Sequence, residues 1–108
     1  MTIKFTIQEL STVINWLDNK QLVAQFHPLM KEKSIEHFYL QQALILDDVL
    51  LKLKKKSLEN KNQFKINISQ IEAISLHEFL RNYPLQPEHN FYQFTRNYLL
   101  GQLNIKLQ

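Results

Sequence analysis

The sequence contains a single glycine, Gly101, and no cysteine in its 108 residues. At an average usage of ~7%, a chain of this length would hold seven or eight glycines. Glycine-rich phosphate loops, dinucleotide-binding fingerprints and nucleophile elbows all need more than one glycine, so these motifs are excluded. The lack of cysteine excludes disulfide bonds, thiolate metal sites and cysteine nucleophiles.

The chain also lacks a long apolar run. Its longest nearly uncharged stretch, Phe38 to Leu46, is far shorter than the ~20 residues of a membrane-spanning helix. The first residues do not show the charged start and apolar stretch of a signal peptide. The abundance of lysine, asparagine and isoleucine is typical of an AT-rich genome. We therefore expect a bacterial, cytoplasmic protein with no membrane partner.

Arginine is scarce as well, with two arginines beside eleven lysines. The formal net charge is +3, which favours acidic partners such as nucleic acid. Arginine, however, is the side chain that best recognises phosphate and guanine through paired hydrogen bonds, so its scarcity weakens that interpretation. The apolar fraction of 44% and the charged fraction of 21% are those of a globular chain. The length predicts one domain, residues 1–108.

Three short segments alternate apolar and polar residues with the period of a β-strand, namely residues 3–7, 64–68 and 103–107. The first two lead into helix-start signals. Thr6 with Glu9 and Ser69 with Glu72 both have the spacing of a capping box. Residues 3–19 and 66–82 therefore share a strand–cap–helix design, which we interpret as a recurrent unit and not as a demonstrated duplication.

Apolar residues at helical spacing predict four helices, at 7–19, 34–57, 69–83 and 87–100. Pro87 is expected to begin the last helix, and Gly101 to end it as a left-handed C′ residue that releases 103–107 as a strand. A short helical turn is expected at 20–26. The fold class predicted is helix-dominated α+β, with about four helices and a small sheet of two or three strands. An all-α bundle is the alternative.

The helix predicted at 34–57 is apolar over most of its circumference, which indicates burial on more than one side. Asp48 is four residues before Lys52 and is expected to pair with it. Asp47 has no such explanation and shares a face with three leucines. This face predicts a protein interface, either with another protein or with a second copy of the chain, formed by Leu40, Leu44, Asp47 and Leu51.

Two groups of residues predict nucleic-acid contact as an alternative. The lysine cluster Lys52, Lys54, Lys55 and Lys56 could contact phosphates, although cations at a helix C-terminus also stabilise the helix itself. In the helix predicted at 87–100, the polar face could read base edges through Gln93, Arg96 and Asn97. The turn before this helix is long for a helix-turn-helix motif and contains two prolines. Its opposite face, formed by Phe91, Phe94 and Tyr98 with neighbouring Tyr92 and Leu99, is expected to be core.

No local pattern assigns a catalytic, cofactor-binding or metal-binding residue. Three of the four histidines are next to a glutamate in sequence, which is the wrong spacing for two ligands on one helix face. His77 borders an apolar stripe and is expected to be partly buried. We therefore predict a small non-catalytic interaction or regulatory protein without a cofactor. A nucleic-acid-binding regulator is the alternative.

Overall fold

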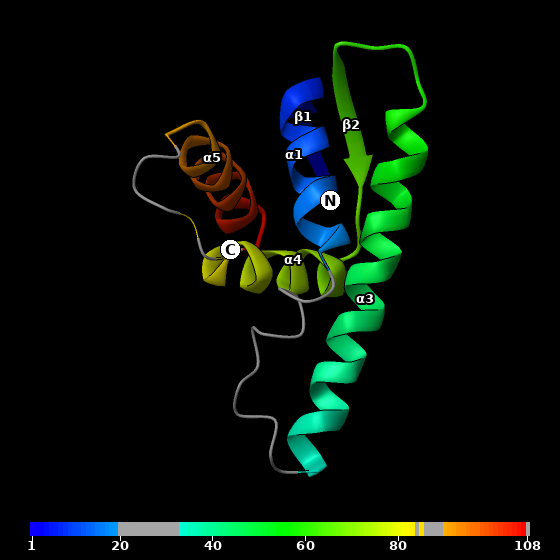
Figure 1. Cartoon of the computed structure of the whole chain (residues 1–108), viewed down its shortest axis with the longest axis vertical. Coiled ribbons are helices and arrows are strands. Elements are labelled where there is room, and N and C mark those ends of the chain that lie inside the picture. Colours follow the sequence, from blue (N-terminus) through cyan, green and yellow to red (C-terminus); the bar gives the residue numbers. More distant parts are fainter. Residues whose placement is uncertain (20–32, 84, 86–89, 108) are drawn as a thin grey trace.

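The computed structural model describes residues 1–19, 33–83, 85 and 90–107, and only the backbone for residues 33–42. Over these residues two strands and four helices follow one another, as Figure 1 shows. Their order is β1 (Thr2–Thr6), α1 (Ile7–Asp18), α3 (Lys33–Ser57), β2 (Gln63–Asn67), α4 (Gln70–Asn82) and α5 (Asn90–Leu107). The predicted helix-dominated α+β class is confirmed.

Each strand runs directly into a helix through a capping box, as the sequence predicts. At α1, the Thr6 hydroxyl accepts a hydrogen bond from the Glu9 amide at 3.2 Å, and the Glu9 carboxylate accepts one from the Thr6 amide at 2.8 Å. At α4, Ser69 and Glu72 repeat both bonds at 3.1 and 2.8 Å. These bonds satisfy amide groups that the first turn of a helix leaves without partners.

The two strands form an antiparallel ladder in which Ile3 is paired with Ile66. These two residues hold equivalent positions in the two strand–cap–helix units. An antiparallel pair of equivalent residues has local two-fold symmetry, so the two strands are related by an approximate two-fold axis at this pair. In each strand alternate residues are buried, which places one face of the sheet on the core and the other toward solvent.

The outer edge of β1 is covered by a side chain of α5. The Lys4 amide donates to the Gln102 Oε1 atom at 3.0 Å, and the Gln102 Nε2 atom donates to the Lys4 carbonyl at 2.9 Å. The side-chain amide thus supplies the bonds that a third strand would make. It protects an edge that would otherwise be open to pairing with another chain.

One hydrophobic cluster connects the described elements. α1 contributes Leu10, Val13 and Leu17 at helical spacing, and α4 contributes Leu76, Phe79 and Leu80, followed by its C-cap residue Tyr83. From the second half of α3 come four buried residues, Leu46, Val49, Leu50 and Leu53. The first turns of α3 extend beyond α4 and the sheet (Figure 1). None of the helices in the described ranges has the length and hydropathy needed to cross a bilayer.

The end of the chain differs from the sequence prediction. Residues 103–107 are not a strand but the last turns of α5, and Gly101 lies inside this helix without a positive φ. The tertiary contacts explain the difference. Leu99 and Leu103 are one helical turn apart and both are completely buried, and their burial outweighs the ~1 kcal/mol that a glycine costs within a helix. Pro87 and residues 20–26, where a helix start and a short turn are predicted, lie outside the described residues.

At low protein concentration, replacing Gly101 with alanine is expected to raise the free energy of unfolding by about 1 kcal/mol, because alanine has the higher helix propensity. A Cβ atom at this position would meet nothing within 4 Å, so no steric cost offsets the gain. Urea denaturation of the two proteins measures the difference. A loss of stability would instead indicate the left-handed C′ glycine that the sequence pattern predicts.

Candidate functional site

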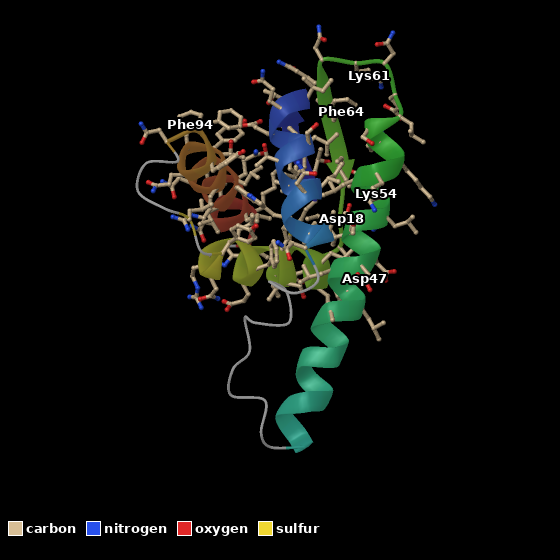
Figure 2. The ribbon with its side chains drawn as sticks, in the orientation of Figure 1. Asp18, Asp47, Lys54, Lys61, Phe64 and Phe94 are labelled. Carbon is tan, nitrogen blue, oxygen red and sulfur yellow. The ribbon has the colours of Figure 1, made fainter. Side chains whose placement is uncertain are left out.

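The predicted α3 interface residues lie largely on the solvent side of that helix. Leu44 is 58% exposed and Leu51 is 53% exposed, and Asp47 between them is also exposed (Figure 2). Leu40 lies in α3 among the residues described by their backbone alone. We call Leu44, Asp47 and Leu51 the α3 face. Two leucines flanking a carboxylate make a surface of mixed character, and whether it is an interface stays a prediction.

The predicted lysine cluster is mostly engaged in contacts within the chain. Lys52 contacts Glu72 of α4 at 2.6 Å, and Lys54 contacts Asp18 of α1 at 3.0 Å. Figure 2 shows Lys54 and Asp18 side by side between α3 and α1. The bond to Glu72 also means that Lys52 connects two helices instead of pairing with Asp48 along its own helix. These lysines therefore hold α3 against its neighbours, as well as lying in its last turns.

Glu72 receives bonds from two directions. Burial by itself would raise the pKa of Glu72, but the hydrogen bonds from the Lys52 ammonium group and the Ser69 amide outweigh burial and lower the pKa. The carboxylate is thus held in its charged form, where it both caps α4 and anchors α3.

The predicted base-reading residues of α5 are not all available to a ligand. Arg96 is half-buried, and its guanidinium group donates to the Tyr83 carbonyl at 3.0 Å. This bond attaches α5 to the C-terminal end of α4, where carbonyl groups lack helical partners. Gln93 is also half-buried, whereas Asn97 is exposed. Nucleic-acid contact by these three residues stays a prediction.

Of the face of α5 that is expected to be core, Leu99 is buried, but its four aromatic residues are exposed. The buried side of α5 consists of Thr95, Leu99 and Leu103. A neighbouring side carries four large hydrophobic residues open to solvent, which we call the α5 stripe: Phe91, Phe94, Tyr98 and Ile105. Phe94 is 67% exposed and Ile105 is 73% exposed, and Phe94 projects from the edge of the molecule (Figure 2). The spacing of the stripe residues by three, four and seven positions was visible in the sequence. However, α5 has two apolar sides, and the sequence does not indicate which of them faces the core.

A cavity adjoins the beginning of the α5 stripe. It has a volume of about 720 Å³ and lies between the first turns of α1 and α5, with Ile7, Phe91 and Tyr92 among its walls. Tyr92 also contacts the buried Trp16 ring, with the ring centres 6.0 Å apart. The exposed apolar surface of α5 is thereby continued onto α1.

A second cavity, of about 430 Å³, gathers lysines that are far apart in the sequence. Its walls include Lys4 of β1, Lys56 at the end of α3, Lys61 of the following loop and Lys65 of β2. Of these four lysines, only Lys56 belongs to the lysine cluster predicted from the sequence. Strand alternation places Lys4 and Lys65 outward, but nothing local reveals that β1 and β2 are neighbours.

The histidine that the sequence singled out is half-buried as expected. The Nε2 atom of His77 lies 2.8 Å from the Asn104 Oδ1 atom, which connects α4 to α5. Within the described part of the chain, no group of three or more His, Cys, Asp or Glu side chains could hold a metal ion.

The comparisons with known proteins do not extend this description, since no family model, no curated protein and no solved structure matches the chain.

Proposed function

We propose that the protein is a non-catalytic, cytoplasmic interaction protein that binds a second copy of itself through the α5 stripe. The observation that carries the proposal is the exposure of four large hydrophobic side chains along one side of a helix that already buries Thr95, Leu99 and Leu103 on a neighbouring side. Contiguous apolar surface of this kind marks interaction sites in soluble proteins.

The pattern of the stripe favours a second copy as the occupant. Residues 91, 94, 98, 101 and 105 follow the alternating three- and four-residue spacing of a coiled-coil seam. In an antiparallel pair, the aromatic first half of one α5 faces the second half of the other, which contains Gly101 and Ile105. Gly101 leaves open space beside it, so a ring of the partner helix has room there. Such a self-complementary arrangement is that of a two-fold symmetric dimer.

The polar positions beside the stripe support the same occupant. Asn97 and Asn104 are uncharged and exposed, so two copies would meet without like-charge repulsion. The α3 face, in contrast, has a carboxylate at its centre. A two-fold pairing of that face would bring two Asp47 side chains together, which is unfavourable. The α5 stripe is therefore the better surface for self-association.

Replacing Phe94 with glutamate is expected to weaken the dimer by roughly 30-fold or more, the effect of losing ~2 kcal/mol at the centre of an interface. Sedimentation velocity over a range of protein concentrations measures the change. Ile105→Glu is expected to act in the same direction. Both side chains are largely exposed, so circular dichroism should show an intact fold.

Leu44→Glu is the matched control, because it places the same charge at a similarly exposed position of the α3 face. It should leave the dimer unchanged. A wild-type chain that remains monomeric at all concentrations would contradict self-association. Dissociation by Leu44→Glu but not by Phe94→Glu would assign the interface to the α3 face instead.

A further inference from the structure

Two lysines lie directly opposite each other on the exposed face of the sheet. Lys4 and Lys65 are register partners in β1 and β2. Met1 and Ile68 exchange both backbone hydrogen bonds, at 2.8 and 3.1 Å. Because bonded and non-bonded pairs alternate along an antiparallel ladder, Lys4 and Lys65 form a non-bonded pair, the kind in which side chains lie closest. Like charges placed in this way destabilise a sheet.

Two more lysines contribute to the same cavity. Lys56 and Lys61 approach the Glu59 carboxylate at 3.4 and 3.1 Å. The hydrogen bond from Lys61 to this carboxylate lowers the pKa of Glu59 despite some desolvation. Neither Lys4 nor Lys65 has an ion-pair partner among the residues that the structure describes.

The carboxylate that lines this cavity, Glu9, does not neutralise these charges. Glu9 is buried, and its carboxylate accepts the Thr6 amide in the capping box of α1. Four lysines and the Glu9 carboxylate thus line this cavity, and Glu59, which is not among its lining residues, pairs with two of these lysines. Positive charge remains in excess where the walls also carry hydroxyl and amide donors from Thr6 and Gln63. A site with this composition attracts an anion that has several charges.

A neighbouring cavity extends the positive surface. It has a volume of about 310 Å³ and shares Lys56 and Lys65 with the first. It adds Lys55, Glu59 and Lys52, of which Lys52 is paired with Glu72. We call the two cavities together the lysine groove. A row of lysines over two adjoining hollows fits a chain of phosphates better than a single phosphate. Lysine acts as a point charge, so such contacts carry little sequence preference.

An aromatic ring at the rim narrows the class of ligand. Tyr98 lines the first cavity and is 43% exposed. A basic groove combined with exposed aromatic rings is the arrangement by which proteins bind single strands, because each unpaired base has a face to stack. We propose that the lysine groove binds the phosphate backbone of single-stranded nucleic acid without sequence specificity. The proposal does not depend on self-association. Tyr98 belongs to the α5 stripe and also lines the groove, so none of the variants that test the two proposals replaces it.

The test is the binding of a fluorescein-labelled oligothymidylate, followed by fluorescence anisotropy from low to physiological salt. The wild-type chain is expected to bind at low salt, with an affinity that falls as salt rises. The double variant Lys4→Gln, Lys65→Gln is expected to bind roughly tenfold more weakly. Its plot of log affinity against log salt should be shallower by about 1.4, since each phosphate contact on a single strand contributes ~0.7.

Two controls make the outcome decisive. Lys106→Gln removes an exposed lysine of α5 that lies outside the groove, and should bind like the wild-type chain. Relief of the Lys4–Lys65 repulsion should leave the double variant at least as stable as the wild type in urea, so weaker binding would not be due to unfolding. No binding at low salt would overturn the proposal. So would equal losses from the groove variant and from Lys106→Gln, or binding of duplex DNA as tight as that of the single strand.

Discussion

Replacing Leu103 with alanine should lower the free energy of unfolding by about 2–5 kcal/mol, whereas Ile105→Ala should change it by less than ~0.5 kcal/mol. Leu103 is completely buried in the core, and Ile105 is 73% exposed on the other side of the same helix. Truncation of Leu103 removes apolar contacts and leaves a cavity, but truncation of Ile105 mainly removes surface that was already in water. Urea denaturation of the dilute chains, where a second copy does not contribute, measures both values.

The pair distinguishes the helix from the strand that the sequence pattern predicts. In a strand, residues 103 and 105 would share one face and both truncations would be costly. In α5 the two positions point to opposite sides. Losses of similar size would therefore contradict the helical end of the chain, and a large loss at Leu103 alone would support it.

Replacing Glu72 with alanine should lower the free energy of unfolding by about 2 kcal/mol, which is the second largest effect on stability that we expect. The change removes the reciprocal capping bond with Ser69, worth ~1 kcal/mol, together with the 2.6 Å contact to Lys52. Half of the Lys52 side chain is in solvent, which limits the ion pair to about 1 kcal/mol. Thermal or urea denaturation provides the measurement.

Glu9→Ala is the matched control for this change. Glu9 has the same capping role at α1, but no ion pair reaches it among the described residues. The difference between the two variants isolates the contribution of Lys52. Equal losses would show that the Lys52 contact adds nothing to the stability.

Acid should remove the same contribution from the wild-type chain. The pKa of Glu72 in the folded chain lies below its ordinary value of 4.5. A carboxyl group with a lowered pKa stabilises the fold fully above that ordinary value, and this stability is lost as the pH falls through the folded pKa. Glu72→Gln keeps a capping side chain without the charge. The free energy of unfolding should therefore fall less below pH 4.5 in this variant than in the wild type.

The local features of the chain were predictable from short stretches of sequence. The capping boxes of Thr6 and Ser69 depend on residues three positions apart, and each bond forms within one helical turn. The buried stripe of α1 follows from helical periodicity over a dozen residues. The helices at 7–18, 33–57 and 70–82 therefore begin and end within about one residue of their predicted bounds.

The α3 face and the lysine groove were only partly predictable from the sequence, because one of them depends on contacts between distant residues. The two leucines of the α3 face are exposed, because that helix has more apolar positions than one buried side needs, and their role in an interface stays a prediction. The lysine groove depends on the register of β1 with β2, which brings residues 4 and 65 together across the length of the chain. Periodicity within a segment carries no information about such a pairing.

The sequence by itself determined where α1, α3 and α4 begin, the alternation of buried and exposed residues in the two strands, and the absence of glycine-dependent phosphate motifs, since each is a property of neighbouring residues. Tertiary structure alone decided the rest. It placed Lys52 against Glu72, turned the aromatic side of α5 to solvent and continued that helix through Gly101. The orientation and length of α5 depend on which of its two apolar sides packs against the core. Burial against residues distant in sequence decides this, and local preference does not.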